Sequence, residues 1–290
     1  MHDIQTPSAL LAFLDEHRYV ADDEMVTALF LLLKLHKPLL LEGPPGVGKT
    51  EIALVLAQWL QTPLIRLQCY EGLDVNAAVY EWNYQKQLLG IRLHEGSNLS
   101  LQEKEHHIFS DEYLLKRPLL QAITDTERSP VLLIDELDRS DEEFEAFLLE
   151  LLSAFQISIP EIGTIKAIHK PYVVLTSNRT RELSDALKRR CLYHWVDYPD
   201  LQKEMAIVQK RLPGIEAELL GQVVKAVQRL RNLKLVKTPG ISETIDWAQA
   251  LMTLGFRQLD NESMERTLGS ILKSVEDIRQ VKAEGISLLE

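Results

Sequence analysis

Short apolar runs separated by amphipathic stretches dominate the first two thirds of the chain. Runs rich in leucine, isoleucine and valine are typical of buried strands, and they lie at residues 39–41, 131–134, 172–175 and 192–196. Residues 64–69 alternate between apolar and polar, which predicts one more strand. Strands spaced by helical stretches pack as parallel strand–helix units, so the pattern predicts an α/β fold with a parallel sheet flanked by helices.

Helical patterns lie on both sides of this region. Thr6 and Pro7 are a cap residue and a first-position proline, which predicts a short helix, and a second helix is expected at residues 23–36. From Asp200 onward the strand patterns stop, and three or four amphipathic helices are expected, with breaks near residues 213–214, 238–240 and 255. The change predicts two domains, an α/β domain at residues 1–198 and a small all-helical domain at residues 199–290.

Residues 70–110 are the hardest part of the α/β domain to interpret. A short helix is expected around residues 76–80, before the apolar stretch 88–93, and residues 74–110 together resemble an insertion. A functional loop and a polar surface excursion fit this segment equally well. His106 and His107 lie in it, and we interpret them as part of a solvated helix face rather than as metal ligands.

Two further patterns follow the strand at residues 131–134. Ser140 and Glu143 have the spacing of a capping box before an amphipathic helix. Residues 156–160 and 164–168 alternate around Gly163, which predicts a hairpin across residues 156–168 that extends beyond the sheet.

Charge and composition narrow the classes of function. The 290-residue chain has a formal net charge of −11, so it lacks an overall basic balance, and we do not expect nucleic acid as a partner. Cys69 and Cys191 are far apart and form no Cys-x-x-Cys pair, so neither a zinc site nor a disulfide framework is expected, and a reducing cytoplasm fits. We expect no signal peptide and no membrane span, since charged residues and a proline interrupt the apolar stretch 28–41.

A glycine-rich segment directly follows the strand at residues 39–41. It fits the phosphate-loop pattern Gly-x4-Gly-Lys-Thr and consists of Gly43, Pro44, Pro45, Gly46, Val47, Gly48, Lys49 and Thr50. In such a loop backbone N–H groups face the phosphates, the lysine ammonium reaches the β and γ oxygens, and the threonine hydroxyl ligates Mg²⁺. A helix that begins at Lys49 adds the positive end of its dipole. The sequence therefore predicts binding of a nucleoside triphosphate with Mg²⁺.

Asp135 and Glu136 place two carboxylates at the end of a hydrophobic strand. Alone, an acidic pair before a helix favours a role in stabilising the helix dipole. Beside a phosphate loop, we expect Asp135 to hold the metal, directly or through water. We expect Glu136 to orient and polarise the water that attacks the γ-phosphate.

Further polar groups follow the strand at residues 172–175. The Asn178 amide can both donate and accept toward the γ-phosphate, and the alternative is an ordinary turn asparagine. Arg189 and Arg190 lie near the end of a short helix that Ser184 caps. They fit a solvated pair at a helix C-terminus or an arginine finger for the γ-phosphate of a neighbouring subunit, and the residues alone leave both open.

The order of these motifs resembles that of the AAA+ ATPases, with the helical domain as the lid. The runs 66–74, 79–84 and 176–183 resemble the MoxR branch, and within it the CoxD-type chaperone ATPase of carbon monoxide dehydrogenase and related molybdenum hydroxylase maturation. The phosphate-loop and acidic motifs identify only an ATPase class. The three longer runs carry the resemblance to the branch.

The resemblance implies a role for each candidate residue. Lys49 and Thr50 contact nucleotide and Mg²⁺, Asp135 and Glu136 form the Walker B pair, and Asn178 is sensor 1. Either Arg189 or Arg190 is the finger that acts in trans. Residues 70–110 contain the helix-2 insert, and the hairpin precedes sensor 1. Related lids often have an arginine near the start of the helix after the Pro-Gly turn, but residues 241–245 contain none, so the sensor-2 role is unassigned.

The resemblance also implies an activity and partners. We expect a hexameric ring that hydrolyses ATP to ADP and phosphate and remodels a protein client. The implied partners are a von Willebrand factor A-domain protein and a molybdenum hydroxylase. Two other functions are alternatives. A nucleic-acid motor or loader shares the ATPase core, and a small-molecule kinase should have its acceptor site beside the phosphate loop. Hydrolysis stimulated by nucleic acid would favour the first alternative, and phosphate transfer to a metabolite without assembly would favour the second.

Overall fold

The computed structural model describes residues 6–93 and 100–284. The strands are β1 Leu39–Glu42, β2 Leu64–Gln68, β3 Tyr80–Trp82, β4 Leu114–Lys116, β5 Val131–Asp135, β6 Gln156–Ile159, β7 Gly163–Lys166, β8 Tyr172–Ser177 and β9 Leu192–Trp195. The helices before residue 195 are α1 Pro7–Glu16, α2 Asp23–Leu35, α3 Lys49–Leu60, α4 Val75–Ala78, α5 Tyr84–Leu93, α6 Leu101–Ile108, α7 Pro118–Thr124, the 3₁₀ turn η1 Leu137–Arg139, α8 Glu142–Ala154 and α9 Asp185–Lys188. The helices after it are α10 Leu201–Arg211, α11 Ala217–Asn232, α12 Ile241–Thr253, α13 Asn261–Ile271 and α14 Val275–Glu284.

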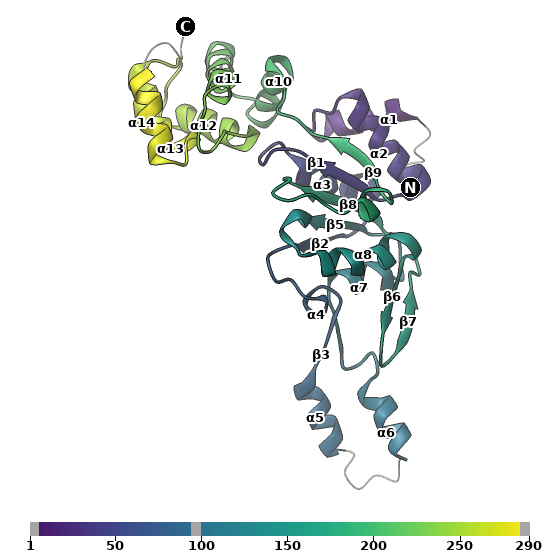
Figure 1. Cartoon of the computed structure of the whole chain (residues 1–290). Coiled ribbons are helices and arrows are strands. Elements are labelled where there is room, and N and C mark those ends of the chain that lie inside the picture. Colours follow the sequence, from purple (N-terminus) through teal and green to yellow (C-terminus); the bar gives the residue numbers. More distant parts are fainter. Residues whose placement is uncertain (1–5, 94–99, 285–290) are drawn as a thin grey trace. The chain divides into compact units, whose positions relative to one another are not determined.

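Five strands form one sheet in the order β2-β5-β8-β1-β9 (Figure 1). The pairs β2/β5, β5/β8 and β8/β1 are parallel, and α7 packs against β2 and β5. This architecture confirms the predicted α/β fold. Because the three inner strands run in parallel, their carboxyl ends lie at one edge of the sheet, where ligands bind in folds of this class.

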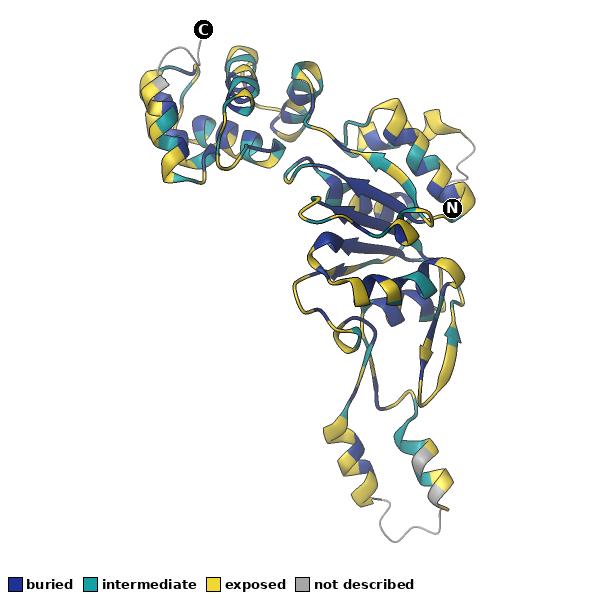
Figure 2. Ribbon diagram, viewed as in Figure 1, coloured by how far each residue is buried: buried dark blue, intermediate teal, exposed yellow. Residues whose placement is uncertain are grey.

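The burial of the inner strands β1, β5 and β8 explains why the sequence predicts them. Every residue of β1 and β5 is buried, as is β8 from Val173 onward (Figure 2). Strands covered on both faces have continuous apolar runs. The outermost strands β2 and β9 are partly exposed and alternate in character, as expected where an edge or one face meets solvent.

The described chain divides into two compact units by its internal contacts. One comprises residues 27–42 and 53–194 and holds most of the sheet. Its core includes Leu132, Phe144 and Leu175. The other comprises residues 6–26, 43–52 and 195–284, so the glycine-rich segment clusters with the C-terminal helices. In this unit α10 to α14 bury a core around Trp247, whose indole N–H donates to the Thr267 hydroxyl at 2.7 Å.

The predicted insertion contains a small antiparallel ribbon that the sequence analysis missed. The expected helix at residues 76–80 was wrong at its end, because α4 stops at Ala78 and Tyr80 begins β3, which pairs with β4. Three-residue strands are too short to give an alternating pattern. Beyond β3 the chain continues into α5, and α5 contacts α6 (Figure 1). Residues 94–99 of the insertion lie outside the described residues.

The structure confirms the predicted hairpin at residues 156–168 and corrects the predicted capping box at Ser140. The hairpin is confirmed: β6 pairs with β7, and Gly163 has a φ of 95°, which a glycine adopts without strain. The capping box at Ser140 was wrong by one residue. Asp141 caps α8 by accepting from the Phe144 N–H at 2.8 Å, whereas the Ser140 hydroxyl donates to the Leu137 carbonyl.

The C-terminal region has five helices within the described residues, more than the three or four expected. The predicted breaks are confirmed, but the break between α13 and α14 at residues 272–274 was missed because it contains neither glycine nor proline. Across residues 6–93 and 100–284, none of the helices combines the length and apolar character needed to cross a membrane.

Candidate functional site

The glycine-rich segment folds tightly around a lysine. α3 begins at Lys49, as predicted, and Lys49 is buried, with Nζ donating at 2.7 Å to the carbonyl oxygens of Gly43 and Pro44. A Cβ at Gly43 would lie only 1.9 Å from the Val196 carbonyl oxygen. The close approach excludes any side chain at this position. The segment therefore has a tightly curled backbone whose carbonyl oxygens bind the Lys49 ammonium.

The start of α12 contacts this segment directly. The Ile241 N–H donates to the Gly46 carbonyl oxygen at 2.8 Å. A Cβ at Gly240 would lie 2.8 Å from both Cα and O of Gly46. Gly240 is the N-cap of α12, and its N–H donates to the Glu243 carboxylate at 2.9 Å. The helix that lacks a sensor-2 arginine thus contacts the segment through its backbone.

Asp135, at the end of β5, is 3% exposed, and two side chains from neighbouring strands bind it. The Thr176 hydroxyl on β8 donates to Asp135 Oδ1 at 2.6 Å, and the same hydroxyl oxygen accepts from the Glu136 N–H at 2.9 Å. On the other side, Arg66 Nη2 donates to Asp135 Oδ2 at 2.5 Å. The sequence alone indicates no role for Thr176 or Arg66, because neither contact follows from local spacing.

Glu136 has an unusual backbone conformation. Its φ of 53° and ψ of 49° are left-handed, which costs a residue with a Cβ about 1 to 3 kcal/mol. The hydrogen bond from its N–H to Thr176 holds this conformation. The carboxylate is 33% exposed and pairs with Arg139 at 3.1 Å. Glu136 therefore presents an accessible carboxylate from a fixed backbone.

Asn178, the residue after β8, is held by a buried acid. Its N–H donates to Asp138 Oδ1 at 3.1 Å, while the N–H and hydroxyl of Thr180 donate to Oδ2 at 2.9 and 2.7 Å. Burial would raise the pKa of Asp138, but the hydrogen bonds from Thr180 and Asn178 outweigh it and lower that pKa. Asp138 fixes the turn that carries Asn178, and the sequence analysis missed it.

A second buried acid fixes the helix that leads to the arginine pair. Glu145 of α8 accepts from the Ser184 N–H at 2.9 Å and forms an ion pair with Arg181. Arg181 also donates to the Ser140 carbonyl oxygen at 2.6 Å. As predicted, Ser184 caps α9 by accepting from Leu187. These contacts fix α9 to α8 and to the turn after the acidic pair.

The two candidate arginines differ in their contacts. Arg190 is exposed but tethered, since Nε donates to the Ser153 hydroxyl at 2.5 Å and Nη1 donates to the Ala186 carbonyl at 2.8 Å. Arg189 is also exposed. The part of the chain that the structure describes offers its guanidinium no hydrogen bond or ion pair. The structure thus separates two residues that the sequence left equivalent.

The predicted strand-end residues follow one edge of the sheet. β1 and β8 end together, with Glu42 opposite Ser177, and the Ser177 hydroxyl donates to the buried Glu42 carboxylate at 3.2 Å. β5 and β8 are likewise in parallel register, with Ile134 opposite Leu175. Asp135, Glu136 and Asn178 therefore gather at the edge from which the glycine-rich segment departs.

The donor atoms at this edge suit a hard cation. Asp135 and Thr176 offer a carboxylate and a hydroxyl oxygen, the ligand type that Mg²⁺ prefers. In the described ranges no three histidine, cysteine or acidic side chains gather into a metal site.

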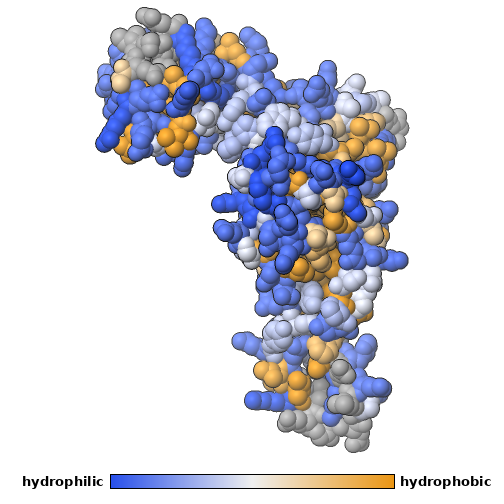
Figure 3. Space-filling model, in the orientation of Figure 1, coloured by the Kyte–Doolittle hydropathy of each residue, from blue (hydrophilic) through white to orange (hydrophobic). Residues whose placement is uncertain are grey.

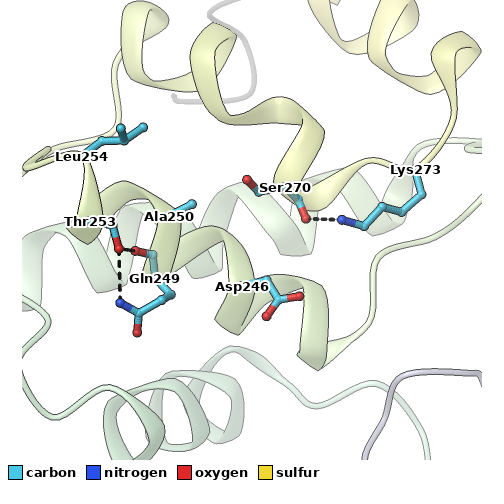
Figure 4. Close-up of a pocket in the computed structure, with 7 residues that line it drawn as sticks. All are labelled: Asp246, Gln249, Ala250, Thr253, Leu254, Ser270 and Lys273. Atoms are coloured by element: carbon cyan, nitrogen blue, oxygen red, sulfur yellow. Dashed lines mark hydrogen bonds between the residues drawn. The ribbon is translucent and has the colours of Figure 1, made fainter.

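Two surface features lie apart from these residues in the sequence. A shallow pocket of about 590 Å³ lies between α12 and α13 and is lined by Asp246 and Gln249 of α12 and by Ser270 and Lys273 (Figure 4). None of the predicted site residues lines it. Exposed apolar side chains also gather over α5 (Figure 3), where Leu88 is 62% exposed.

Known proteins resemble this chain in sequence. The family model of the AAA domain (dynein-related subfamily) matches residues 38–191. An uncharacterized protein of Staphylococcus haemolyticus is 27% identical over 274 residues, which is 92% of this chain and 96% of that protein. An uncharacterized protein of Staphylococcus aureus is 28% identical over 228 residues, covering 77% of this chain and 78% of its own.

Solved structures resemble it in fold. Two variants of RuvB from Thermotoga maritima superpose with TM-scores of 0.52 and 0.51, at 22% and 21% identity. Each alignment covers 88% of this chain and 71% of the RuvB chain. At this level of identity, the similarity concerns the fold alone.

Proposed function

Since the chain belongs to the AAA domain family (dynein-related subfamily), we propose that it hydrolyses ATP and uses the energy to remodel a protein client. The family supports an ATPase of the remodelling type. The reaction, its residues and its client are the proposal. The observation that carries it is the bridge made by Thr176, which donates to Asp135 and accepts from the Glu136 backbone at the edge where the glycine-rich segment begins.

Residues 43–50 bind the nucleotide in this proposal. The N–H groups of Gly46 to Thr50 and the start of α3 supply hydrogen-bond donors and a positive dipole for the phosphates. The Lys49 ammonium exchanges its carbonyl partners for phosphate oxygens. Thr50 and Asp135 hold Mg²⁺, which when bound neutralises charge on the phosphates.

Glu136 acts as the residue that orients and polarises the attacking water. Its left-handed backbone and the hydrogen bond to Thr176 fix the carboxylate's starting point, so its position does not depend on a flexible loop. Asn178 contributes its amide to the same water and to the γ-phosphate. Asp138 holds the Asn178 backbone in place for that task.

Arg189 is the residue we assign as the arginine finger. An arginine acting on the γ-phosphate of another copy needs a guanidinium that is exposed and released from its own chain. Arg189 meets both conditions, whereas Arg190 is tethered to Ser153 and Ala186. This role requires self-association into a ring, and resemblance to related ATPases favours a hexamer.

The finer assignment rests on the resemblance of residues 66–74, 79–84 and 176–183 to the CoxD-type ATPases of the MoxR branch. On that basis the client is a molybdenum hydroxylase such as carbon monoxide dehydrogenase, and a von Willebrand factor A-domain protein is a partner. The insertion and the β6–β7 hairpin are the parts proposed to contact the client.

A capture experiment tests this assignment. Glu136→Gln protein held in ATP should retain its client, because binding persists while hydrolysis is slow. The matched control is Lys49→Ala, which should not bind ATP and should not retain the client. Recovery of a hydroxylase subunit or an A-domain protein with the first variant alone supports the proposal. Equal recovery with both variants contradicts it.

A nucleic-acid motor is the second candidate function. RuvB shares the fold, but that similarity does not extend to what RuvB acts on. The net charge of −11 disfavours a phosphate-backbone partner. ATP hydrolysis measured with and without DNA or RNA separates the two functions. Nucleic acid stimulates hydrolysis by a nucleic-acid motor but not by a protein remodeller.

A further inference from the structure

The Arg66–Asp135 ion pair joins a half-exposed arginine to the buried acid at the end of β5. The Arg66 side chain is 53% exposed, and that of Asp135 is 4% exposed. Nη2 of Arg66 donates to Asp135 Oδ2 at 2.5 Å and to Gln68 Oε1 at 2.7 Å. A buried carboxylate needs such a partner, because an unpaired charge away from water is costly.

The arginine reaches Asp135 because of the strand register. β2 and β5 are parallel neighbours, and Gln68 lies opposite Asp135. Side chains alternate along a strand, so Arg66 and Gln68 point to the same face of the sheet, two residues apart. The guanidinium thus extends along β2 to the carboxylate, and Gln68 orients it there. The register of β2 and β5 therefore fixes the contact between Arg66 and Asp135.

The two oxygens of Asp135 have different partners. Oδ1 accepts from the Thr176 hydroxyl, a neutral donor, whereas Oδ2 accepts from a cation. Magnesium binds oxygen at about 2.0 to 2.1 Å. A guanidinium at hydrogen-bond distance and a divalent cation at coordination distance repel each other if they share one carboxylate.

We propose that Arg66 is a resident counter-ion of Asp135 that competes with Mg²⁺ for this carboxylate and so sets how much Mg²⁺ the protein needs to bind nucleotide. Arrival of the metal releases Arg66 from Asp135. Loss of the metal allows the arginine to return, which keeps the buried acid paired. This inference rests on the proposed function, because it assumes that Asp135 faces the metal of a bound nucleotide.

The backbone that follows β2 also contacts Asp135. β2 leads through Cys69 to the segment that begins α4, and the Cys69 N–H donates to the Asp135 carbonyl at 2.8 Å.

Binding of a fluorescent ADP at fixed concentration, titrated with Mg²⁺, tests the proposal without relying on hydrolysis. In Arg66→Gln the Mg²⁺ concentration for half-maximal binding should fall by about tenfold, since a competing cation has been removed. Arg66→Lys keeps a positive charge and should remain close to the wild type. Arg117→Gln breaks an exposed ion pair with Glu81 and should leave the Mg²⁺ requirement unchanged.

A second readout separates competition from a purely structural role. Without nucleotide and with EDTA, Arg66→Gln should melt at a lower temperature, because Asp135 loses its charged partner. A structural role alone predicts that loss with no tighter Mg²⁺ dependence. An unchanged or higher Mg²⁺ requirement in Arg66→Gln overturns the inference. Failure of the wild type to bind nucleotide at any Mg²⁺ concentration contradicts the proposed function instead.

Discussion

The N–H of Ile241, the first residue of α12, donates a hydrogen bond of 2.8 Å to the carbonyl oxygen of Gly46 in the glycine-rich segment. Gly240 packs against the same residue, with no room for a Cβ. This hydrogen bond joins the backbone of the segment directly to that of α12. We expect phosphates bound at residues 43–50 to shift α12, and α12 to influence how tightly the phosphates are held.

Substitution of Gly240 tests this contact. A Cβ in Gly240→Ala would lie 2.8 Å from Cα and O of Gly46, so the segment and the helix must separate. Gly240 has a φ of −87°, which alanine adopts readily, so any effect is steric and not backbone strain. We expect ATP affinity, measured by calorimetry, to fall by about tenfold, the equivalent of a clash costing 1 to 2 kcal/mol.

The matched control is Gly221→Ala in α11, where a Cβ meets no atom within 4 Å. This variant should bind ATP like the wild type and be slightly more stable, because alanine is favoured over glycine inside a helix by about 1 kcal/mol. Equal ATP affinity in Gly240→Ala and Gly221→Ala would show that the contact with Gly46 has no influence on binding.

A buried ion pair stabilises the Pro239–Gly240 turn that precedes α12. Arg231 and Glu204 are 6% and 0% exposed in their side chains, and two hydrogen bonds of 2.6 and 2.7 Å join them. Arg231 also donates to the Pro239 carbonyl, and Thr244 bonds both Glu204 and the Gly240 carbonyl. The pair therefore fixes the Pro239–Gly240 turn within the helical region.

Substitution of Arg231 should lower the stability of the helical region. In Arg231→Met, Glu204 stays buried without its cation, and we expect the helical region to lose about 3 to 5 kcal/mol of stability in urea unfolding. The exposed Arg266–Glu262 pair supplies the control, because Arg266→Met should cost about 0.5 kcal/mol or less. Similar losses in the two variants contradict a structural role for the buried pair.

The arginine finger can be assigned by mixing subunits. Arg189→Ala should abolish ATP hydrolysis by the assembled protein while leaving nucleotide binding intact, because the finger acts on a neighbour's γ-phosphate. Arg190→Ala should retain most activity and lose stability, since its contacts are with Ser153 and Ala186 of its own chain.

Mixed assemblies of Arg189→Ala with Glu136→Gln should recover part of the activity, because some interfaces then combine an intact finger with an intact Glu136. Persistent inactivity in confirmed mixed assemblies would count against action in trans. Greater loss from Arg190→Ala than from Arg189→Ala would reverse the assignment.

The change in protein stability at acidic pH should show how much the ionised Asp138 carboxylate stabilises the fold. Its pKa lies below the ordinary 3.8, since hydrogen bonds from Thr180 and Asn178 outweigh burial. A carboxyl group with a lowered folded-state pKa contributes stability above its unfolded pKa and loses that contribution as pH falls through the folded value.

Asp138→Asn should therefore be about 1 to 3 kcal/mol less stable than the wild type at pH 7. The gap should narrow on acidification below about pH 3.8. Unfolding curves across this range provide the measurement. A gap that is the same at pH 7 and at pH 3 would mean that the ionised carboxylate of Asp138 is not what stabilises the turn.

The parts of the fold that could be predicted are those with a local signal. β1, β5 and β8 are buried on both faces, so their composition alone marks them. As expected, Thr6 and Ser184 are N-caps and Pro7 is the first residue of α1. The ribbon of β3 and β4 and the break before α14 lack such signals. Three-residue strands have no measurable period, and the break has no glycine or proline.

The candidate site likewise contains residues that the sequence predicts and residues that it misses. Asp135 and Asn178 were expected at the ends of strands, and Asp135 is the last residue of β5 while Asn178 directly follows β8. The residues that hold them were missed, because Thr176, Asp138 and Arg66 reach their partners only through the packing of strands that are distant in sequence. Spacing along the chain cannot show such contacts. The roles of these residues in catalysis remain predictions for the experiments above.

ATP turnover and ATP binding measured together on Glu136→Gln test the central claim most directly. We expect binding close to that of the wild type, because residues 43–50 are unchanged, and hydrolysis reduced by about 100-fold or more, because the group that polarises the water has lost its charge. Hydrolysis at the wild-type rate by Glu136→Gln would contradict the account.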